Sequence, residues 1–94
     1  MIYIEGLEWD EENERHISRH SVLPTEVEEA VEGRLHAYKH KGRLVILGRS
    51  EVGRYLLVVL EHQRRGFWRP VTARDMDPKE RRLLQRVLTK KGVK

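Results

Sequence analysis

The stretch YLLVVL, residues Tyr55–Leu60, decides the fold of this 94-residue chain. Six consecutive apolar residues are typical of a strand that is covered on both faces, so we expect this segment at the centre of a sheet. Further strand candidates lie on either side of it in the sequence, at Leu35–Tyr38, Leu44–Leu47 and Phe67–Ala73. Because the connections between these segments are short, the four strands should form an antiparallel meander.

The segments around the four strands extend this prediction. Ser50–Gly53 is expected to form a hairpin turn, and Glu61–Gly66 a polar connection. Pro70 lies inside the last strand and has no N–H group for the ladder, so that strand should be at an edge or bulged at this residue. A further short edge strand is predicted at Met1–Ile4, which would allow strand pairing between copies of the chain and hence a homo-oligomer.

Two short acidic helices should precede the meander. Asp10 is a good N-cap, and the acidic residues that follow it favour a helix over residues 10–20. A second helix follows, in which Thr25 and Glu28 have the spacing of a capping box. Gly33 is expected to end this second helix.

A third helix is predicted at the C-terminus, with Asp77 as its cap and Pro78 in its first turn. The residues predicted to be buried are Leu83, Leu84, Val87 and Leu88, and the basic residues predicted mostly on the other side are Arg81, Arg82, Arg86 and Lys90. The fold class is therefore α+β, an antiparallel sheet of four to five strands with two N-terminal helices and one C-terminal helix. We expect the helices on one face of the sheet and the other face partly open. Residues 1–94 should form a single domain, with residues 90–94 as a loose basic tail.

Charge is divided unevenly along the sequence. Residues 1–32 contain ten acidic and two basic side chains, whereas residues 33–94 contain five acidic and seventeen basic ones. A compact piece with so many cations favours a polyanionic partner, because each cation that meets a phosphate releases a condensed counterion. The alternative is a basic surface that is simply solvated.

The composition excludes several classes of protein. The absence of cysteine excludes disulfides and thiolate metal sites, and no apolar run is long enough for a membrane helix. The acidic N-terminus is unlike a signal peptide, so we expect a cytoplasmic protein. His16 and His20, like His36 and His40, have i, i+4 spacing, but neither pair comes with the further residues of a zinc motif. We therefore expect no metal and no other cofactor.

Three arginines lie at the ends of predicted strands, namely Arg49, Arg54 and Arg74. Antiparallel pairing can bring these ends to one rim of the sheet, where guanidinium groups present a donor fork that matches phosphate oxygens. Each arginine could instead be solvated or paired with an acidic residue of the first helices. Tyr55 and Trp68 are candidate surfaces for base stacking, with core packing as the alternative.

A histidine would complete a site for chemistry on RNA. RNA can be cleaved without a metal when a ribose 2′-hydroxyl attacks the neighbouring phosphate, which requires proton transfer and fixed positive charge at the transition state. His20, at the end of the first helix, suits the proton transfer, although His16 and His20 could equally pack around Trp9 and Ile17. The catalytic set that we expect to converge in one electropositive pocket is His20, Arg49, Arg54 and Arg74.

Several short segments occur in an order that fits a known family. They are Trp9–Asn13, His16–Ile17, Arg19–His20 with Val22, Glu26–Ala30, Gly48–Arg49, Gly53–Leu56 with Val58–Val59, Val71–Arg74 and Lys79–Arg82. Together they span about residues 7–86, and the sequence resembles the BrnT-type toxins of type II toxin–antitoxin systems.

The resemblance implies a RelE-like fold and a metal-independent endoribonuclease that cleaves RNA to inhibit translation. It also implies a cognate antitoxin, encoded adjacently, that binds DNA. The matching positions are His20, Arg49, Arg54 and Arg74. Many members have a lysine in place of Asn13 and Lys-His-Gly in place of Arg19–Ser21. In this chain we therefore expect histidine and arginine, rather than lysine, to carry the chemistry. Two other functions stay open: a basic module that binds nucleic acid without cutting it, and a component that binds an acidic protein partner.

Overall fold

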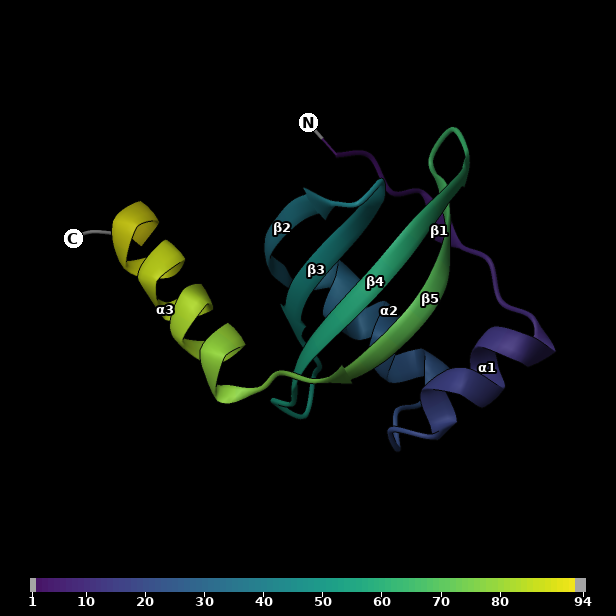
Figure 1. Cartoon of the computed structure of the whole chain (residues 1–94), viewed down its shortest axis with the longest axis horizontal. Coiled ribbons are helices and arrows are strands. Elements are labelled where there is room, and N and C mark those ends of the chain that lie inside the picture. Colours follow the sequence, from purple (N-terminus) through teal and green to yellow (C-terminus); the bar gives the residue numbers. More distant parts are fainter. Residues whose placement is uncertain (1, 93–94) are drawn as a thin grey trace.

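Eight helices and strands follow one another along residues 2–92, which are the residues described by the computed structural model. They are β1 (Gly6–Leu7), α1 (Glu11–Ser18), α2 (Pro24–Glu32), β2 (Arg34–His40), β3 (Arg43–Arg49), β4 (Tyr55–Arg64), β5 (Phe67–Asp75) and α3 (Pro78–Gly92). The strands form one sheet in the order β1-β5-β4-β3-β2 (Figure 1). The central position predicted for the YLLVVL segment is confirmed, because β4 is the middle strand.

The sheet is mixed rather than purely antiparallel. Strands β2 to β5 form the predicted antiparallel meander, but β1 pairs parallel with β5, with Gly6 opposite Phe67. The strand predicted at Met1–Ile4 is misplaced: the described part of that segment is not in a strand, and residue 1 lies outside the described residues. Strand pairing with β5 begins only at Gly6, whose N–H donates at 3.2 Å to the carbonyl of Gly66, the residue just before β5.

The hairpin between β4 and β5 is tighter than predicted. β4 runs on to Arg64, so Arg65–Gly66 alone separates the two strands, where Glu61–Gly66 was expected as a connection. The polar residues of that segment mark an exposed strand end rather than a loop. The bulge expected at Pro70 is confirmed, because the ladder shifts register next to the pair formed by Leu60 and Pro70.

The starts of α1 and α2 follow from their caps. The Asp10 carboxylate accepts from the Asn13 N–H at 2.8 Å, and the Asn13 side chain accepts from the Asp10 N–H at 2.9 Å, which confirms the first cap. The capping role predicted for Thr25 is wrong. The Leu23 N–H donates to the Glu26 carboxylate at 3.0 Å, and α2 begins with the proline that follows Leu23. Proline suits this position because the first turn of a helix needs no N–H donor.

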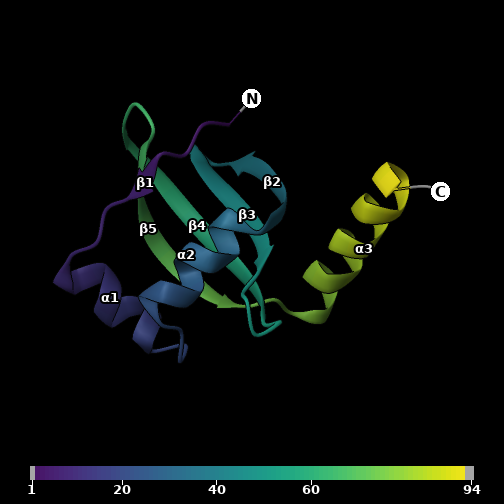
Figure 2. The ribbon, with the colours of Figure 1, turned by 180° about the vertical axis from the view of Figure 1, so that it is seen from behind.

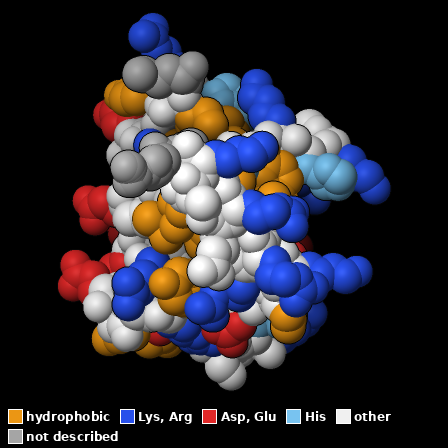
Figure 3. Space-filling model, turned by 90° about the vertical axis from the view of Figure 1, so that its left-hand side faces the viewer, with side chains coloured by type: hydrophobic (Ala, Val, Ile, Leu, Met, Phe, Trp, Pro, Cys, Tyr) orange, Lys and Arg blue, Asp and Glu red, His pale blue; other side chains and the backbone are white. Residues whose placement is uncertain are grey.

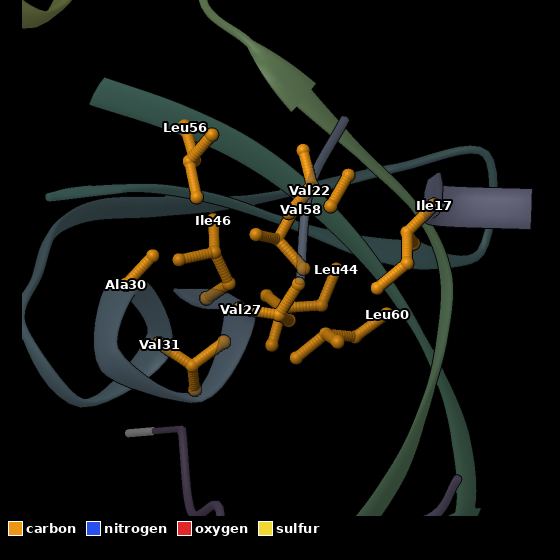
Figure 4. Packing of buried hydrophobic residues seen from close by; sticks show 11 residues of the cluster. Ile17, Val22, Val27, Ala30, Val31, Leu44, Ile46, Leu56, Val58 and Leu60 are labelled. Atoms are coloured by element: carbon orange, nitrogen blue, oxygen red, sulfur yellow. The ribbon is translucent and has the colours of Figure 1, made fainter. Parts of the chain in front are cut away.

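We call the side of the sheet covered by α1 and α2 the helix face (Figure 2). It holds the larger hydrophobic cluster, in which α2 packs against the central strands (Figure 4). The buried members are Ile17, Val22, Val27, Ala30, Val31, Leu44, Ile46, Leu56, Val58, Leu60 and Ala73. Removing this contiguous apolar surface from water is the main driving force for folding.

The expectation that all helices pack on one face is wrong, because α3 packs on the opposite side, which we call the α3 face. Its cluster consists of Val45, Leu47, Leu57, Met76 and Leu84, with Leu35, Tyr38, Tyr55, Val59 and Leu83 packed beside it. Successive strand residues point to opposite faces, so the unbroken apolar runs of β3 and β4 need cover on both. α3 supplies part of that cover.

The docking of α3 is lighter than its apolar stripe predicts. Leu84 is buried, whereas Leu83 and Val87 are half-buried and Leu88 is 38% exposed. Residues 90–92 of the predicted tail belong to the helix, and the last two residues lie outside the described part of the chain.

Basic side chains predominate on the side of the molecule that α3 forms. In that view Lys and Arg side chains are spread over the surface, and most of the visible Asp and Glu side chains lie along one margin (Figure 3). The uneven charge along the sequence therefore becomes an uneven charge in space. Among the described residues, no helix combines the length and the apolar character needed to cross a membrane.

Candidate nucleic-acid interface

The ends of β3, β4 and β5 meet at one rim of the sheet, as the spacing of the arginines predicted. Arg49 ends β3 opposite Tyr55, Arg54 directly precedes β4, and Arg74 near the end of β5 pairs with Leu57. The side chains nevertheless leave this rim on different faces. Tyr55 and Leu57 belong to the α3-face cluster, so their partners Arg49 and Arg74 lie on that face. Arg54 is bonded to the turn between α1 and α2, on the helix face.

Arg54 is a clamp that holds the first two helices to the sheet. Its guanidinium donates to the Asp75 carboxylate at 2.7 and 3.2 Å, to Glu26 at 3.0 Å, and to the carbonyls of Ser21 and His20 at 2.7 and 3.3 Å. The hydrogen bonds with Asp75 raise the pKa of Arg54 above its ordinary value and lower the pKa of Asp75. A phosphate at Arg54 would have to displace two carboxylates.

Arg74 is engaged in the same way on the other face. It makes a bidentate ion pair with Glu80 at 2.9 and 2.7 Å and donates to the Asp75 carbonyl at 3.1 Å. The Glu80 hydrogen bonds raise the pKa of Arg74. Glu80 also accepts from the Asp77 N–H at 2.9 Å, so the pair joins the end of β5 to the capping box of α3.

Arg49 is the predicted arginine whose guanidinium is still available. Its guanidinium carbon lies 5.2 Å from the centre of the Tyr55 ring, and that of Arg81 lies 3.9 Å from the same ring. Both arginines are exposed, and neither has a carboxylate partner among the described residues. We call Arg49, Tyr55 and Arg81 the Tyr55 cluster. A hollow of about 390 Å³ adjoins it, lined by Tyr55, Arg81, Leu84, Gln85, Leu88 and Thr89.

Sequence reasoning missed Arg81, which was expected on the outer side of the last helix. The lining of the hollow places it on the same stripe as Leu84, Gln85 and Leu88, at the i, i+3, i+4 and i+7 spacing of one helix face. That spacing is visible in the sequence. An arginine in such a stripe is easily assigned to the solvated side of a helix, but its long side chain can lie along an aromatic ring.

His20 does not join the arginines through its side chain. It is exposed in the turn after α1, where its ring centre lies 6.0 Å from that of His16, and its backbone carbonyl accepts from Arg54 at 3.3 Å. The structure thus brings four predicted residues to one end of the sheet without uniting them in one pocket. Two arginines are neutralised, on opposite faces, and Arg49 is grouped with Tyr55 and Arg81 instead.

The described residues contain no group of three His, Cys, Asp or Glu side chains that could hold a metal ion. No protein-family model matches the chain, and no curated protein matches it.

Proposed function

We propose that this protein is the toxin of a toxin–antitoxin pair, a metal-independent endoribonuclease that inhibits translation by cleaving RNA. In this proposal single-stranded RNA binds on the α3 face, with a phosphate at the Tyr55 cluster. The partner that neutralises the toxin is an antitoxin encoded beside it, itself a DNA-binding protein. The order of short segments that resembles the BrnT-type toxins supports the choice of activity.

The observation that carries the proposal is the pair of guanidinium groups on Tyr55. Arg49 and Arg81 lie on one aromatic ring, both exposed and both without a carboxylate partner among residues 2–92. Each guanidinium presents a fork of donors that matches the oxygens of a phosphate. The surrounding surface is rich in Lys and Arg (Figure 3), which raises the local concentration of a polyanion.

Cleavage at this position would need no redox partner and no metal. The ribose 2′-hydroxyl loses its proton and its oxygen bonds to phosphorus, while the bond from phosphorus to the 5′-oxygen breaks and that oxygen takes up a proton. Arg49 and Arg81 would stabilise the extra negative charge on the phosphorus centre. Tyr55 carries the hydroxyl group of the cluster and is our candidate for proton transfer, with His20 as the alternative.

A specific observation favours a second candidate, a basic module that binds RNA without cutting it. Arg54 and Arg74 are held by carboxylates, and the His20 ring is not grouped with them. Such a module would show binding that weakens steeply with salt, because counterion release drives it, and it would release no product.

The test is incubation of the purified chain with a labelled single-stranded RNA in EDTA. We expect cleavage that Arg49→Ala slows by about 100-fold, a typical cost of losing one donor to developing charge. Tyr55→Phe keeps the ring and removes the hydroxyl, so it tests proton transfer, and His20→Ala tests the alternative. The matched control is Arg82→Ala, which removes an exposed arginine next to Arg81 and should leave the rate within about twofold.

Intact RNA at stoichiometric protein would overturn the nuclease and leave the binding module, provided that the chain still retains the RNA. Absence of both cleavage and binding would overturn the whole proposal. Expression of the chain in a bacterial host should arrest growth, and co-expression of the adjacent reading frame should relieve the arrest.

A further inference from the structure

A second basic hollow lies at the opposite end of the sheet from the Tyr55 cluster. It has a volume of about 520 Å³ and sits between the β2–β3 turn and the neighbouring ends of β4 and β5. Its polar and aromatic lining consists of Lys39, His40, Lys41, Arg43, His62 and Trp68. We call it the hairpin pocket. The arginine set and the Tyr55 cluster do not contribute to it.

The hairpin pocket has an excess of positive charge. Lys39 and Lys41 are exposed and have no carboxylate partner among the described residues. Arg43, also in the lining, is paired with Glu61 at 3.5 Å. Lys41 has a φ of 52° and is followed by Gly42 with a φ of 79°, a pattern typical of a tight two-residue hairpin turn. The turn thus holds the two free ammonium groups on a regular hairpin rather than on a long loop.

Trp68 gives the pocket a fixed aromatic wall. Its indole is half-buried, and its Nε1–H donates to the Tyr3 carbonyl at 3.0 Å. The His62 ring meets it edge-on, with ring centres 5.0 Å apart. An indole held from two sides loses little freedom when a flat ring stacks on it, which favours binding.

We infer that the hairpin pocket binds a nucleotide unit, with its base against Trp68 and its phosphate at Lys39 and Lys41. Proteins hold unpaired nucleotides with an aromatic ring beside cations, because the base stacks on the ring and the cations bind the phosphates of the backbone. The ligand is either a free nucleotide or one residue of a single-stranded RNA. The second case rests on the RNA-binding part of the proposed function and adds a second contact at the far end of the sheet.

The chain offers an internal control for the test, because it contains two tryptophans, Trp9 and Trp68. In a proton–nitrogen correlation spectrum each gives one indole N–H signal, and Trp9→Phe assigns them. The Trp9 indole donates to Glu28 on the α2 side of the molecule, away from the lining of the pocket. The probes are adenosine monophosphate and a five-residue 2′-O-methyl oligoribonucleotide, which lacks the attacking hydroxyl and cannot be cleaved.

We expect the Trp68 signal to shift with either probe while the Trp9 signal stays in place. The double variant Lys39→Ala, Lys41→Ala should weaken this binding about tenfold or more, the usual value of charge-assisted hydrogen bonds to a phosphate. The control Lys79→Ala, Lys90→Ala removes two exposed lysines of α3 and should leave the affinity within about twofold.

Tighter binding of the oligonucleotide than of the mononucleotide identifies RNA as the ligand, and equal affinities identify a free nucleotide. A Trp68 signal that is unmoved by both probes at millimolar concentration overturns the inference, as does a shift that the double variant leaves unchanged. The Arg49→Ala variant separates the two proposals. It removes the phosphate contact at the Tyr55 cluster, so a Trp68 shift that persists in it belongs to the hairpin pocket alone.

Discussion

On the helix face, Arg54 is bound by Glu26, by Asp75 and by the backbone of the turn after α1. On the α3 face, by contrast, the cations of the Tyr55 cluster have no carboxylate among the described residues. The first arrangement uses arginines to tie segments together. The second leaves donors facing solvent, where they add little to stability and are available to an anion. The comparison teaches that at this rim of the sheet one face can be devoted to stability and the other to binding.

The apolar residues follow the same division. Among the described residues, the helix-face cluster has eleven buried members and the α3-face cluster has five. Changes on the helix face should therefore lower the free energy of unfolding more than changes on the α3 face, which should act on RNA instead. The following variants test this division, in order of decreasing effect on stability.

Gly48→Ala should be the most damaging single change. A Cβ atom at this residue would collide with the Ala30 carbonyl oxygen and lie 2.8 Å from its carbonyl carbon, so α2 would have to move away from β3. We expect a loss of about 3 kcal/mol or more, the upper range for overpacking a core, in urea unfolding followed by circular dichroism. Gly42→Ala is the control, since its Cβ would meet nothing within 4 Å and only the positive φ is strained, at about 1 kcal/mol. Equal losses would show that the close approach of α2 to β3 is not what holds the helix face.

Arg54→Ala should have the next largest effect. It removes a guanidinium whose side chain is 24% exposed, takes from Glu26 its charged partner, and leaves Asp75 and the carbonyl of Ser21 without this donor. We expect the unfolding free energy to fall by about 2 kcal/mol, less than for a fully buried pair because solvent can still reach the site. Arg19→Ala removes an exposed arginine near the end of α1 and should stay within about 0.5 kcal/mol. A loss no greater than that of the control would remove Arg54 from its clamping role.

The clamp also predicts how stability changes with pH. Arg54 lowers the pKa of Asp75 in the folded state below its ordinary value of 3.8. The unfolded chain therefore binds more protons near that pH, so stability is fully present above about pH 4 and is lost as the pH falls through the lowered value. Urea unfolding between neutral and acidic pH should show this loss, and Arg54→Ala should reduce its slope. An unchanged slope in the variant would mean that other carboxylates cause the acid sensitivity.

The sequence allowed these segments to be located, but not the faces on which their side chains lie. Local patterns were enough for β4, for the cap at Asp10 and for the bulge at Pro70, because each depends on residues close together in the chain. The hydrogen bonds of Arg54 depend on the turn at Ser21. This turn is far from Arg54 in the sequence and comes near it only when α2 packs on the sheet. Such a partner has no local signal.

The position of α3 shows a second limit. The unbroken apolar run of β4 predicted cover on both faces, whereas the helices were all expected on one face with the other partly open. The first argument was the stronger, because an apolar face left in water raises the free energy of the folded state. Given α3 on the opposite face, the period of its sequence would have placed Arg81 beside Tyr55. The missing information was therefore the packing of one helix, not the chemistry of its residues.

Arg74→Ala tests whether the α3 face also contains a structural ion pair. Arg74 and Glu80 join β5 to α3, and their side chains are 36% and 17% exposed. Breaking a pair of this exposure should lower the unfolding free energy by about 1 kcal/mol. Glu80→Ala removes the same pair together with the capping hydrogen bond from the Asp77 N–H, so it should lower stability at least as much, and it should have the same effect on RNA cleavage. If Arg74→Ala alone abolishes cleavage, Arg74 acts on the substrate and the pair opens when RNA binds.

Arg49→Ala should have the smallest effect on stability, because it breaks no ion pair among the described residues and removes one exposed side chain from the Tyr55 ring. We expect a change within about 0.5 kcal/mol in urea unfolding. Its effect should appear in RNA affinity instead. The slope of log affinity against log salt should fall in magnitude by about 1, the value for one lost phosphate contact, while Arg54→Ala should leave that slope unchanged at temperatures where it is folded. A variant at Arg49 that destabilises the chain but keeps the slope would reverse the assignment of the two faces, because it would make Arg49 a structural residue and leave RNA binding to other cations.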